Sequence, residues 1–429
     1  MTPEVKKRIE QIRQGIVPEG YVKDKDGIYP RDWASKKIGQ WLKLAERPIV
    51  LQDEEAYRLV TVRRGFGGVD SRGSFLGKNV LVKNYFIVKT GDFIISKRQI
   101  AHGACGIVPP DLDGAVVSNE YNVFLPQDGT NIQMFNLMMQ LPHYKRLFYL
   151  MSDGVHIEKL LFKTQDWMKR TLAMPLLKEQ QKIAEILSTQ DKAIELQGRK
   201  IEELKRFKKG CLEKMFPRKG QKVPEKRFPG FTDDWEQRKL GEVGKCQSGI
   251  GFPDVEQGGK IGTPFYKVSD MNNYGNEQEM TCANNYVTDE QIIRKNWKPI
   301  TEVPAVIFAK VGAAIMLNRK RLCRFPFLLD NNTMAYKFGE QWDTNFGKTL
   351  FEKIDLTELV QVGALPSYNA TDVENLDIKM PADTNEQKVI GEFFANLDRL
   401  ITLHQRKLEE MKRQKKALMQ LLLTGIVRV

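Results

Sequence analysis

The sequence predicts an α+β protein: two mixed α/β domains joined by two long antiparallel coiled-coil helices, in a pseudo-twofold internal repeat. Three observations support this prediction. A long charged stretch occurs twice, a short signature around a tryptophan occurs twice, and a Met-Pro pair precedes each long stretch. A repeat of this kind indicates one structural unit that is built twice along the chain.

The long stretch first occurs as Glu179–Phe216 and returns as Glu386–Leu423. Both copies open with Glu-Gln, and both carry Arg-Lys, Glu-Glu and Lys-Arg further along at the same spacing. Neither copy contains proline, and both consist largely of Glu, Lys, Arg, Gln and Leu, which are strong helix formers. The sequence therefore predicts two long helices.

Apolar residues in both stretches recur with alternating steps of four and three, which is the heptad pattern of a coiled coil. Such a seam needs a partner helix, and each copy is the natural partner of the other. Gln197 and His404 are polar positions inside the seams, and residues of this kind can fix the register of a coil. The residues predicted to pair the helices are Leu187, Ile194, Ile201, Leu204, Phe394, Leu397, Ile401, Leu408 and Met411.

The tryptophan signature reads Asp-Trp, two variable residues, a basic pair and then Ile-Gly or Leu-Gly, at Asp32–Gly39 and again at Asp234–Gly241. The repeated Met-Pro pairs are Met174-Pro175 and Met380-Pro381. We expect five segments: 1–173 as N-terminal segment and first domain, 174–217 as central helix, 218–232 as linker, 233–379 as second domain and 380–429 as C-terminal helix.

The segments between signature and helix, roughly 40–173 and 242–379, are not obviously alike in sequence. They are rich in short strand-like runs separated by Gly, Pro, Asn and Asp. Predicted strands include Val80–Val88, Phe93–Ser96, Tyr121–Leu125, Ala305–Ala309 and Met334–Phe338. Residues 2–16 predict a short helix capped by Thr2 that docks on a longer helix near the C-terminus, and Gly425 is the expected C-cap of the last helix.

Composition limits the function classes. The formal net charge is +13, and a basic excess of this size favours a polyanion partner, nucleic acid before membrane. No window approaches the apolar length of a membrane span, and the N-terminus lacks the apolar region of a secretory signal. The five cysteines are scattered without metal-site spacing, which indicates a cytoplasmic protein without a disulfide framework or zinc site.

Two distinct domains in a repeated, basic chain suggest two readers of a bipartite duplex site. In the first domain, a glycine-rich segment carries three arginines, and polar and basic residues follow the strand that ends at Ile95. Glycine allows close backbone approach, and arginine binds guanine edges or phosphate. The alternative is a solvated surface. The candidate DNA-binding residues are Arg63, Arg64, Arg72, Ser96, Lys97 and Arg98.

In the second domain, Lys310 holds the corresponding place after a strand, and a dense basic cluster follows it. Phosphate binding and a solvated charge run are both open for that cluster. Asp330-Asn331-Asn332 indicates a turn whose amides could also read bases, and for Ser367–Asn369 capping by Asn369 or Thr371 is favoured over DNA contact. The candidates are Lys310, Asn318, Arg319, Lys320, Arg321, Arg324, Asn331, Asn332 and Tyr368.

Catalytic patterns are missing from the sequence. No methyltransferase Asn-Pro-Pro-aromatic motif, no methyl-donor glycine loop and no phosphate-binding loop is present. Cys105 lies beside His102, but without a third partner a packed turn is favoured over a nucleophile. We therefore expect no catalytic residues, no metal site and no cofactor in this chain.

Together these features resemble the specificity subunit of type I DNA restriction–modification enzymes, over nearly the whole length. The markers are Met174-Pro175 and Met380-Pro381 with the helices after them, and Asp234-Trp235 with Lys239–Gly241. Further markers are Phe228–Phe231, Gly91–Ile94 and Asp330–Asn332. The resemblance implies two target recognition domains, each reading a few base pairs, on antiparallel helices that set the gap between half-sites.

The resemblance further implies double-stranded DNA as ligand, two methyltransferase subunits as partners, and restriction subunits joining them. Catalysis would reside in those partners, with S-adenosylmethionine for adenine methylation and ATP and Mg²⁺ for restriction. Two alternatives stand beside this hypothesis. A coiled-coil interaction protein without nucleic acid would explain the helices but not the two distinct domains. A fused methyltransferase or nuclease would require a catalytic motif that the sequence does not show.

Overall fold

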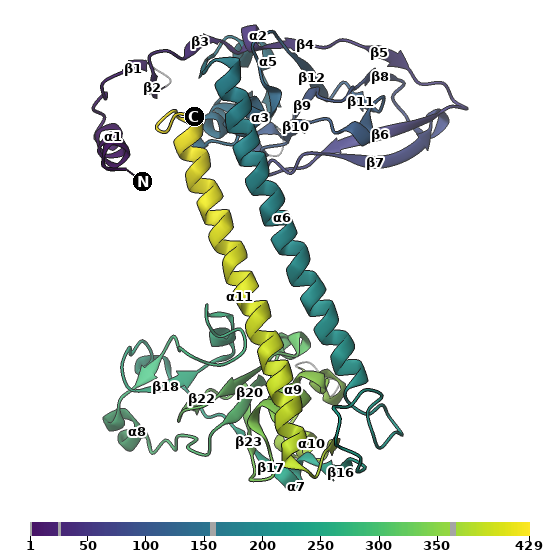
Figure 1. The fold of residues 1–429 in the computed structure, drawn as a ribbon, viewed down its shortest axis with the longest axis vertical. Coiled ribbons are helices and arrows are strands. Elements are labelled where there is room, and N and C mark those ends of the chain that lie inside the picture. Colours follow the sequence, from purple (N-terminus) through teal and green to yellow (C-terminus); the bar gives the residue numbers. More distant parts are fainter. Residues whose placement is uncertain (1, 25–26, 155–159, 361–365) are drawn as a thin grey trace. The chain divides into compact units, whose positions relative to one another are not determined.

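The computed structural model describes residues 2–24, 27–154, 160–360 and 366–429. The chain divides into two compact units. Unit 1 comprises Met1–Glu195 with Glu409–Val429, and unit 2 comprises Leu196–Leu408. Each unit therefore holds one of the predicted domains together with part of both long helices, and each is described by itself below (Figure 1).

The domain in unit 1 is built on a four-stranded antiparallel sheet with the order β10-β9-β12-β4. Its strands are β4 (Leu42–Leu44), β9 (Phe93–Ser96), β10 (Cys105–Ile107) and β12 (Tyr121–Pro126). The central strand β9 is fully buried, and Phe93 and Phe124 pack with Phe135 and Trp167 in the largest core cluster of this unit.

The domain in unit 2 contains a four-stranded antiparallel sheet with the order β17-β23-β20-β21. Its strands are β17 (Gly244–Ser248), β20 (Ala305–Ala309), β21 (Lys320–Cys323) and β23 (Thr333–Phe338). In both domains the first strand pairs with the last, the last with the second, and the second with the third. The two segments that look unlike in sequence thus share one sheet topology.

A second sheet differs between the domains. Unit 1 has five strands in the order β5-β8-β11-β6-β7, and unit 2 has three in the order β19-β18-β22. The former are β5 (Pro48–Val50), β6 (Ala56–Val62), β7 (Val69–Leu76), β8 (Asn84–Ile87) and β11 (Val116–Ser118). The latter are β18 (Thr263–Tyr266), β19 (Tyr286–Val287) and β22 (Leu328–Leu329).

Short elements complete each unit. In unit 1 they are α1 (Pro3–Arg13), β1 (Tyr21–Asp24), β2 (Gly27–Pro30), α3 (Ile132–Met139), α4 (Pro142–Leu150), β13 (Ser152–Asp153), β14 (Leu161–Phe162) and α5 (Thr164–Met168). In unit 2 they are α8 (Asp289–Lys295), α9 (Thr344–Lys353) and α10 (Ala370–Glu374).

The repeated signatures prove to be the two strands that close each domain. In unit 1, β3 (Ala34–Lys37) follows the tryptophan and pairs antiparallel with β15 (Thr171–Met174), which leads into Pro175. In unit 2, β16 (Glu236–Lys239) pairs in the same way with β24 (Asp377–Met380). The residue after each tryptophan lies opposite the methionine of the Met-Pro pair.

A one-turn helix follows each signature strand, α2 (Ile38–Trp41) and α7 (Leu240–Val243), and the signature glycine lies in it. A Cβ atom at Gly241 would lie 3.0 Å from Cβ of Glu374 in α10, and one at Gly39 would lie 3.3 Å from Cε of Met168 in α5. The glycine therefore lets this helix pack closely against the short helix at the end of each domain.

The two predicted long helices are α6 (Leu177–Lys214) and α11 (Thr384–Leu423). They run antiparallel in both units. In unit 2, Nε2 of Gln197 lies 2.8 Å from Nδ1 of His404, and Nζ of Lys208 lies 2.5 Å from Oδ1 of Asp398. In unit 1, Nζ of Lys415 lies 2.5 Å from Oδ1 of Asp191. Lys415 and Asp398 lie 207 residues after Lys208 and Asp191, so the two ion pairs are equivalent in the repeat.

The predicted pairing residues are found at the buried face of these helices. Leu187 joins Leu418 and Leu422 in the core of unit 1, and Phe394 and Leu397 join Met215 in the core of unit 2. Ile201 and Ile401 are buried, whereas Ile194, Leu204, Leu408 and Met411 are half-buried. Gln197 and His404, the predicted polar positions of the seam, contact each other directly.

Most predicted strands are confirmed with their bounds shifted by one residue at most. The exception is Val80–Val88, where only Asn84–Ile87 forms a strand. Gly425 follows α11 with a left-handed φ of 69°, as a C-cap requires. The N-terminal helix forms, capped by Thr2, but none of its residues is buried. It is bound near the C-terminus as expected, but the bond is to the tail after α11 and not to the helix: Arg8 donates to the carbonyl of Ile426 (2.5 Å).

Within the described part of the chain, no helix combines the length and the apolar character that crossing a membrane would need.

A buried glutamine at the start of each long helix anchors the domain to the helix. Gln180 accepts from the backbone N–H of Asn131, the N-cap of α3, and donates to the carbonyls of Gly129 and Pro175, over 2.8–2.9 Å. Its equivalent Gln387 accepts from Asp343, the N-cap of α9, and donates to the carbonyls of Gln341 and Pro381, over 2.9–3.1 Å. Both side chains are at most 1% exposed.

We predict that Gln180→Leu lowers the unfolding free energy of unit 1 by about 3 kcal/mol, because it leaves a buried N–H and two buried carbonyls without partners. The measurement is the urea midpoint followed by tryptophan fluorescence. Gln181→Leu is the matched control, since Gln181 is exposed and its loss should change the free energy by less than about 0.5 kcal/mol. Equal effects of the two variants would contradict the proposal that the buried hydrogen bonds of Gln180 stabilise unit 1.

Candidate nucleic-acid interface

The candidate residues at the exit of the central strand form the same junction in both domains. In unit 1, the backbone N–H of Lys97 donates to the carbonyl of Glu120 over 2.9 Å, and its carbonyl accepts from Phe162 over 3.0 Å. In unit 2, the N–H of Lys310 donates to the carbonyl of Asn332 over 2.9 Å, and its carbonyl accepts from Tyr368 over 3.3 Å. Lys97 and Lys310 are therefore equivalent positions of two different domains.

This junction brings together segments that are distant in sequence. In unit 2 it collects Lys310, the Asn331-Asn332 turn and the Ser367-Tyr368 segment, which also forms a bridge from Ser367 to Val311. Asn331 and Asn332 are exposed, and the Lys310 side chain is half-buried with no polar partner among the described residues. Three of the predicted stretches of the second domain thus lie together at one end of the two central strands, β20 and β23.

The two predicted stretches of the first domain also lie together. The Arg63–Gly68 loop joins β6 to β7, and its tip is held by two backbone hydrogen bonds. Gly65 N–H donates to the carbonyl of His102 over 2.7 Å, and Phe66 N–H donates to the carbonyl of Gly103 over 2.8 Å. Phe66 has a left-handed φ of 60° and packs where a Cβ atom at Gly103 would lie. The glycine-rich loop therefore docks on the turn that follows Lys97 and Arg98.

The arginines of the first domain differ in how they are engaged. Arg63 forms an ion pair with Asp70, and Nε of Arg98 lies 2.6 Å from Oε2 of Glu120. Arg64 is engaged as well. Arg72 is exposed on β7, and its guanidinium has no partner in the part of the chain that the structure describes. All four are at the surface, and their contact with DNA stays a prediction.

Three candidates point into the protein, so their predicted exposure to a ligand is wrong. Ser96 is the last residue of the buried strand β9 and is 7% exposed. Tyr368 is 5% exposed, and its hydroxyl donates to the carbonyl of Ala309 over 2.5 Å. Burial raises the pKa of the Tyr368 hydroxyl. Both side chains are buried, and that of Tyr368 bonds the strand that precedes the junction.

Lys320 is the third. Its side chain is buried, and its ammonium donates to Oδ1 of Asn318 and to the carbonyl of Ile354 over 2.6 and 2.5 Å. Because burial disfavours the ammonium and its bonded acceptors are neutral, the pKa of Lys320 is lowered to about 8. Because the ammonium is buried and bonded inside the domain, the predicted phosphate contact does not fit this residue.

The rest of the basic cluster in unit 2 is largely bound within the domain. Arg321 donates to the carbonyls of Asn276 and Lys320, and burial lowers its pKa. Arg324 forms a bidentate pair with Glu279 at 3.0 Å, and Arg319 donates to Asn272. Asn318 has a left-handed φ of 47° and accepts from the N–H of Leu356. These side chains therefore do not form a run of solvated charges, because most of them are bonded to other groups of the domain.

Two predicted structural roles are confirmed: Asn369 caps a helix, and Cys105 is packed in the core. Asn369 is the N-cap of α10, with a reciprocal hydrogen bond to Asp372 at N3. Cys105 is buried in β10, and burial raises the pKa of its thiol, which disfavours a nucleophile. Among the described residues, no group of His, Cys, Asp and Glu could hold a metal ion.

Comparison with known proteins decides the family. The family model for the type I restriction modification DNA specificity domain matches twice, at residues 30–206 and 232–413. These two matches cover most of the chain and coincide with its two repeats. The chain belongs to the family of type I restriction–modification DNA specificity proteins.

The similarity extends over full-length relatives. The chain is 25% identical over 436 residues to the specificity subunit of the type I restriction enzyme MjaVIII from Methanocaldococcus jannaschii, covering 93% of this chain and 94% of the relative. The fold is also that of two solved structures. One is a chain of a type I restriction–modification system studied for its complex assembly and conformational transition, with a TM-score of 0.57, 16% identity, and coverage of 93% and 99%. The other is the type I S subunit from M. genitalium, with a TM-score of 0.55, 13% identity, and coverage of 91% and 96%.

An arginine that follows each long helix binds the start of the other helix, and in unit 1 it also binds the tryptophan signature; we call this contact the clasp. In unit 1, Arg428 forms bidentate pairs with Asp32 and with Glu179, all at 2.7–2.8 Å. In unit 2, Arg227 forms a bidentate pair with Glu386 at 2.6–2.7 Å. Glu179 and Glu386 are equivalent, so the tail after α11 and the linker after α6 have the same role.

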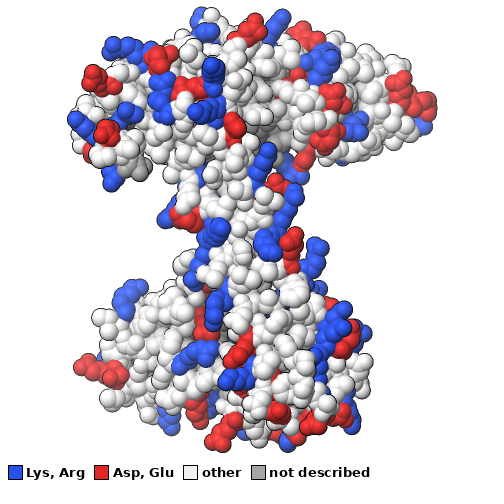
Figure 2. All heavy atoms as spheres, in the orientation of Figure 1, with Lys and Arg blue, Asp and Glu red and all other residues white. Residues whose placement is uncertain are grey.

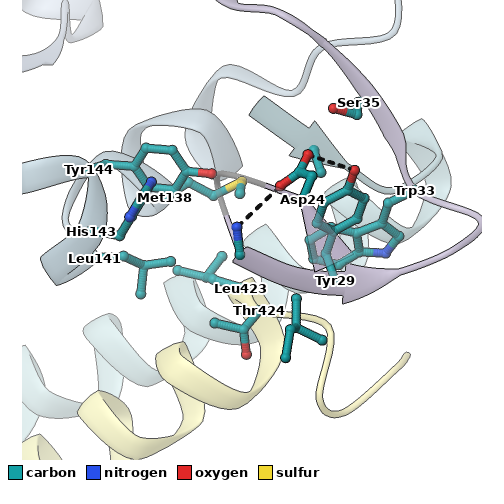
Figure 3. Close-up of a pocket in the computed structure, with 13 residues that line it drawn as sticks. Asp24, Tyr29, Trp33, Ser35, Met138, Leu141, His143, Tyr144, Leu423 and Thr424 are labelled. Atoms are coloured by element: carbon teal, nitrogen blue, oxygen red, sulfur yellow. Dashed lines mark hydrogen bonds between the residues drawn. The ribbon is translucent and has the colours of Figure 1, made fainter. Parts of the chain in front are cut away.

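A small cavity of about 100 Å³ lies beside this clasp in the first specificity domain. Figure 3 shows Trp33, Tyr29 and Asp24 on one side, His143 and Tyr144 from α4 on the other, and Leu423 and Thr424 at the end of α11 below. Asp24 accepts from the hydroxyl of Tyr29 over 3.0 Å and from the N–H of Gly27 over 3.1 Å. We assign the cavity to imperfect packing between these elements.

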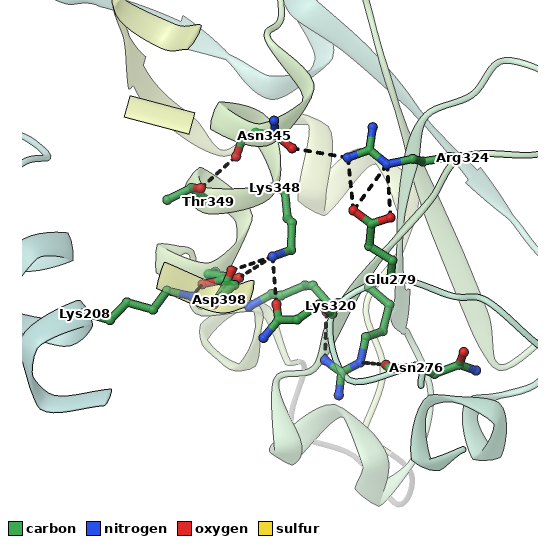
Figure 4. Close-up of polar contacts among 12 residues, drawn as sticks. Lys208, Asn276, Glu279, Lys320, Arg324, Asn345, Lys348, Thr349 and Asp398 are labelled. Atoms are coloured by element: carbon green, nitrogen blue, oxygen red, sulfur yellow. Dashed lines mark hydrogen bonds and ion pairs between the residues drawn. The ribbon is translucent and has the colours of Figure 1, made fainter. Parts of the chain in front are cut away.

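Four charged side chains form a buried ion cluster beneath the second specificity domain (Figure 4). Asp398 of α11 lies between Lys208 of α6 and Lys348 of α9, at 2.5 and 2.6 Å, and Glu352 of α9 pairs with both lysines. Lys348 also donates to Gln278 over 2.7 Å. The side chains of Lys208, Lys348 and Asp398 are at most 12% exposed. The cluster was not predicted from the sequence, although Lys208 continues the four–three spacing of Ile201 and Leu204 in the heptad seam.

Burial lowers the pKa of Lys208, but the carboxylates of Glu352 and Asp398 outweigh burial, and the pKa is raised. The contribution of Lys208 to stability is therefore complete below its unfolded pKa and is lost only when the pH rises through the higher folded value. In the first specificity domain the equivalent pair, Lys415 and Asp191, lacks the α9 residues, and Asp191 is 52% exposed in its side chain. The same sequence pair thus has two environments.

Charge on the helix surfaces is mainly positive. Figure 2 shows Lys and Arg outnumbering Asp and Glu along the exposed helices. The exposed cations of the repeated run are Arg199, Lys200, Lys205, Arg206 and Lys209 in α6 and Arg406, Lys407, Lys412, Arg413 and Lys416 in α11. Lys205 and Lys412 pair with glutamates three residues earlier, so part of this charge is balanced on the helix itself.

We predict that Asp398→Asn destabilises the protein by about 3–5 kcal/mol, because it leaves two buried ammonium groups with too little compensating charge. Asp191→Asn, the repeat-equivalent change at an exposed pair, should cost less than about 1 kcal/mol. The urea midpoints of the two variants at neutral pH provide the measurement. Similar losses for both positions would show that burial of the cluster does not control its contribution.

Proposed function

We propose that this chain is the DNA-reading subunit of a type I restriction–modification complex, and that it recognises an asymmetric, bipartite duplex site. The observation that carries the proposal is the double match to the DNA specificity domain, one match for each repeat. Each of the two target recognition domains reads one half-site. The halves differ because the second sheets of the domains differ in strand number and sequence.

The equivalent junctions at Lys97 and Lys310 support the proposal that the two domains contact DNA in the same way. Each lies at the exit of the central strand of the shared four-stranded sheet, with its lysine side chain unengaged by described polar groups. Lysine at such a position supplies phosphate contacts that set the register of a domain on the duplex, while other side chains read the bases. The formal net charge of +13 favours the same polyanion ligand.

Catalysis is proposed to reside in partner subunits. Two methyltransferase subunits would transfer a methyl group from S-adenosylmethionine to adenine, and restriction subunits with ATP and Mg²⁺ would join them. This chain would recognise the target sequence but hold no cofactor. It would act in the cytoplasm, where the target DNA is. Its buried Cys105 offers no nucleophile for a reaction of its own.

Two exposed leucines at equivalent helix positions support docking of two copies of one partner. Leu196 of α6 is 63% exposed and Leu403 of α11, its counterpart 207 residues later, is 55% exposed. A single exposed leucine is common on protein surfaces, so the support comes from its recurrence at the same position of both helices. Because the surrounding helix sequence is also repeated, a surface that binds one leucine can bind the other.

We predict that co-expression with the methyltransferase subunit, in a host without adenine methylation, yields methylated adenines at one bipartite motif. Long-read sequencing of the modified genome measures it. The two halves should be unlike and separated by a fixed gap. Exchange of residues 40–173 for another first recognition domain should change one half only.

The same experiment separates the alternatives. A coiled-coil interaction protein would give no methylation with a partner that is competent alongside another specificity chain. A fused methyltransferase would methylate DNA when this chain is expressed alone. Either result would overturn the proposal.

We predict that Leu196→Asp and Leu403→Asp each remove one of two bound methyltransferase subunits, because a carboxylate cannot be buried in an apolar contact. Native mass spectrometry of the purified complex counts the subunits. The double variant should retain none, and Val255→Asp is the control, since Val255 is 86% exposed on the second recognition domain. Full occupancy in the double variant would place the docking surface elsewhere.

A further inference from the structure

We propose that Arg72 is a specificity-determining residue of the first recognition domain and that it reads a guanine in the major groove. This inference rests on the proposed function and assigns one residue of that site a role. It is carried by three features of the strand that holds Arg72: a β-bulge, an edge position in the sheet, and an arginine without a partner.

The β-bulge places Arg72 outside the regular ladder. In the β6–β7 hairpin, Leu59 pairs with Gly73 and Val60 pairs with Ser71, so that Arg72 is the extra residue on the bulged strand. A bulge of this kind redirects a side chain and is frequent next to functional sites. The ladder is regular on both sides of this point.

Local bonds fix the bulge. Oγ of Ser71 accepts from the N–H of Gly73 over 3.1 Å, which closes the backbone around Arg72. Gly73 has a φ of 114°, a conformation that side chains with Cβ rarely adopt. The sequence Ser-Arg-Gly therefore fixes the backbone of the bulge from which the Arg72 side chain projects.

The position of β7 leaves Arg72 accessible. β7 is an edge strand of the five-stranded sheet, with β6 as its one partner. The same hairpin carries the Arg63–Gly68 loop, which docks on the turn after Lys97 and Arg98. Gly68 of this loop lies where a Cβ atom at Gly106 of β10 would be, at 2.9 Å. The hairpin is thus joined firmly to the junction at which we place a phosphate contact.

The charge of Arg72 is uncompensated. Arg63, Arg64 and Arg98 are all engaged, and the buried Asp92 is bound by Arg47 in a bidentate pair at 2.6 and 3.0 Å. Arg72 has no ion pair or hydrogen bond through its guanidinium among the residues that the structure describes. An exposed guanidinium held on a rigid bulge retains all five donors for a ligand.

Guanine is the base that fits these donors. A guanidinium can donate two parallel hydrogen bonds to O6 and N7 of guanine, the commonest specific contact of proteins in the major groove. A contact with phosphate would use the charge of the Arg72 guanidinium but would not require a fixed orientation of its N–H groups. The rigid bulge, with Gly73 and Ser71 dedicated to it, favours the directional contact.

The test is the methylome of Arg72→Ala and Arg72→Lys, each co-expressed with the methyltransferase subunit. One guanine position in one half-site should become degenerate in Arg72→Ala, with discrimination falling about tenfold or more. Arg72→Lys should lose part of the discrimination, because its ammonium keeps the charge but lacks the planar fork of the guanidinium. The other half-site and the gap should stay unchanged, which also shows that the variant folds and assembles.

Arg146→Ala is the matched control, since Arg146 is an exposed arginine of α4 with no polar partner among the described residues. An unchanged motif in Arg72→Ala would overturn the inference. A uniform fall in methylation with the motif preserved would also overturn it, because that result identifies a phosphate contact. Failure of the proposed function itself would be visible separately, as absence of a bipartite motif in the wild-type chain.

Discussion

The buried glutamine at the start of each long helix is the constraint on which the rest of each unit depends. Gln180 and Gln387 each join three backbone groups: the N-cap of a domain helix, the loop before it, and the proline that ends the closing strand. A long charged helix has few buried contacts along its length. Its relation to the domain must therefore be set at its end, by polar groups whose directions are fixed.

This anchor explains why variable domains can stand on a repeated helix. The four-stranded sheet, the closing strand pair and the anchored helix α3 or α9 have the same connections in both units, although the intervening sequences are unlike. What differs is the second sheet and, in the first domain, the bulged β6–β7 hairpin. The shared elements include the proposed phosphate contacts at Lys97 and Lys310, whereas the elements that differ include the hairpin that carries Arg72.

The sequence predicted the repeated parts well because they depend on local rules. Heptad spacing predicted α6 and α11, and short apolar runs predicted β9 and β20 with their bounds. It predicted the surroundings of the candidate DNA-binding side chains less well, because the type of a residue does not determine whether its side chain is buried or exposed. Lys320 and Tyr368 turn inward to hold Asn318 and Ala309, and Arg321 and Arg324 are bound by carbonyl and carboxylate groups. Tertiary contacts decided those side chains.

The two copies of one ion pair show how position changes the value of the same residues. Lys415 and Asp191 face solvent on one side, and water screens their attraction. Lys208 and Asp398 are covered by α9, which adds Lys348 and Glu352, so that two ammonium groups and two carboxylates compensate one another away from water. Removal of any one member would leave a buried charge unbalanced. The second recognition domain is thus tied to the helices by a buried ion cluster as well as by its glutamine anchor. The first has its own glutamine anchor and the Arg428 ion pairs, but its counterpart of the cluster is the exposed pair of Lys415 and Asp191.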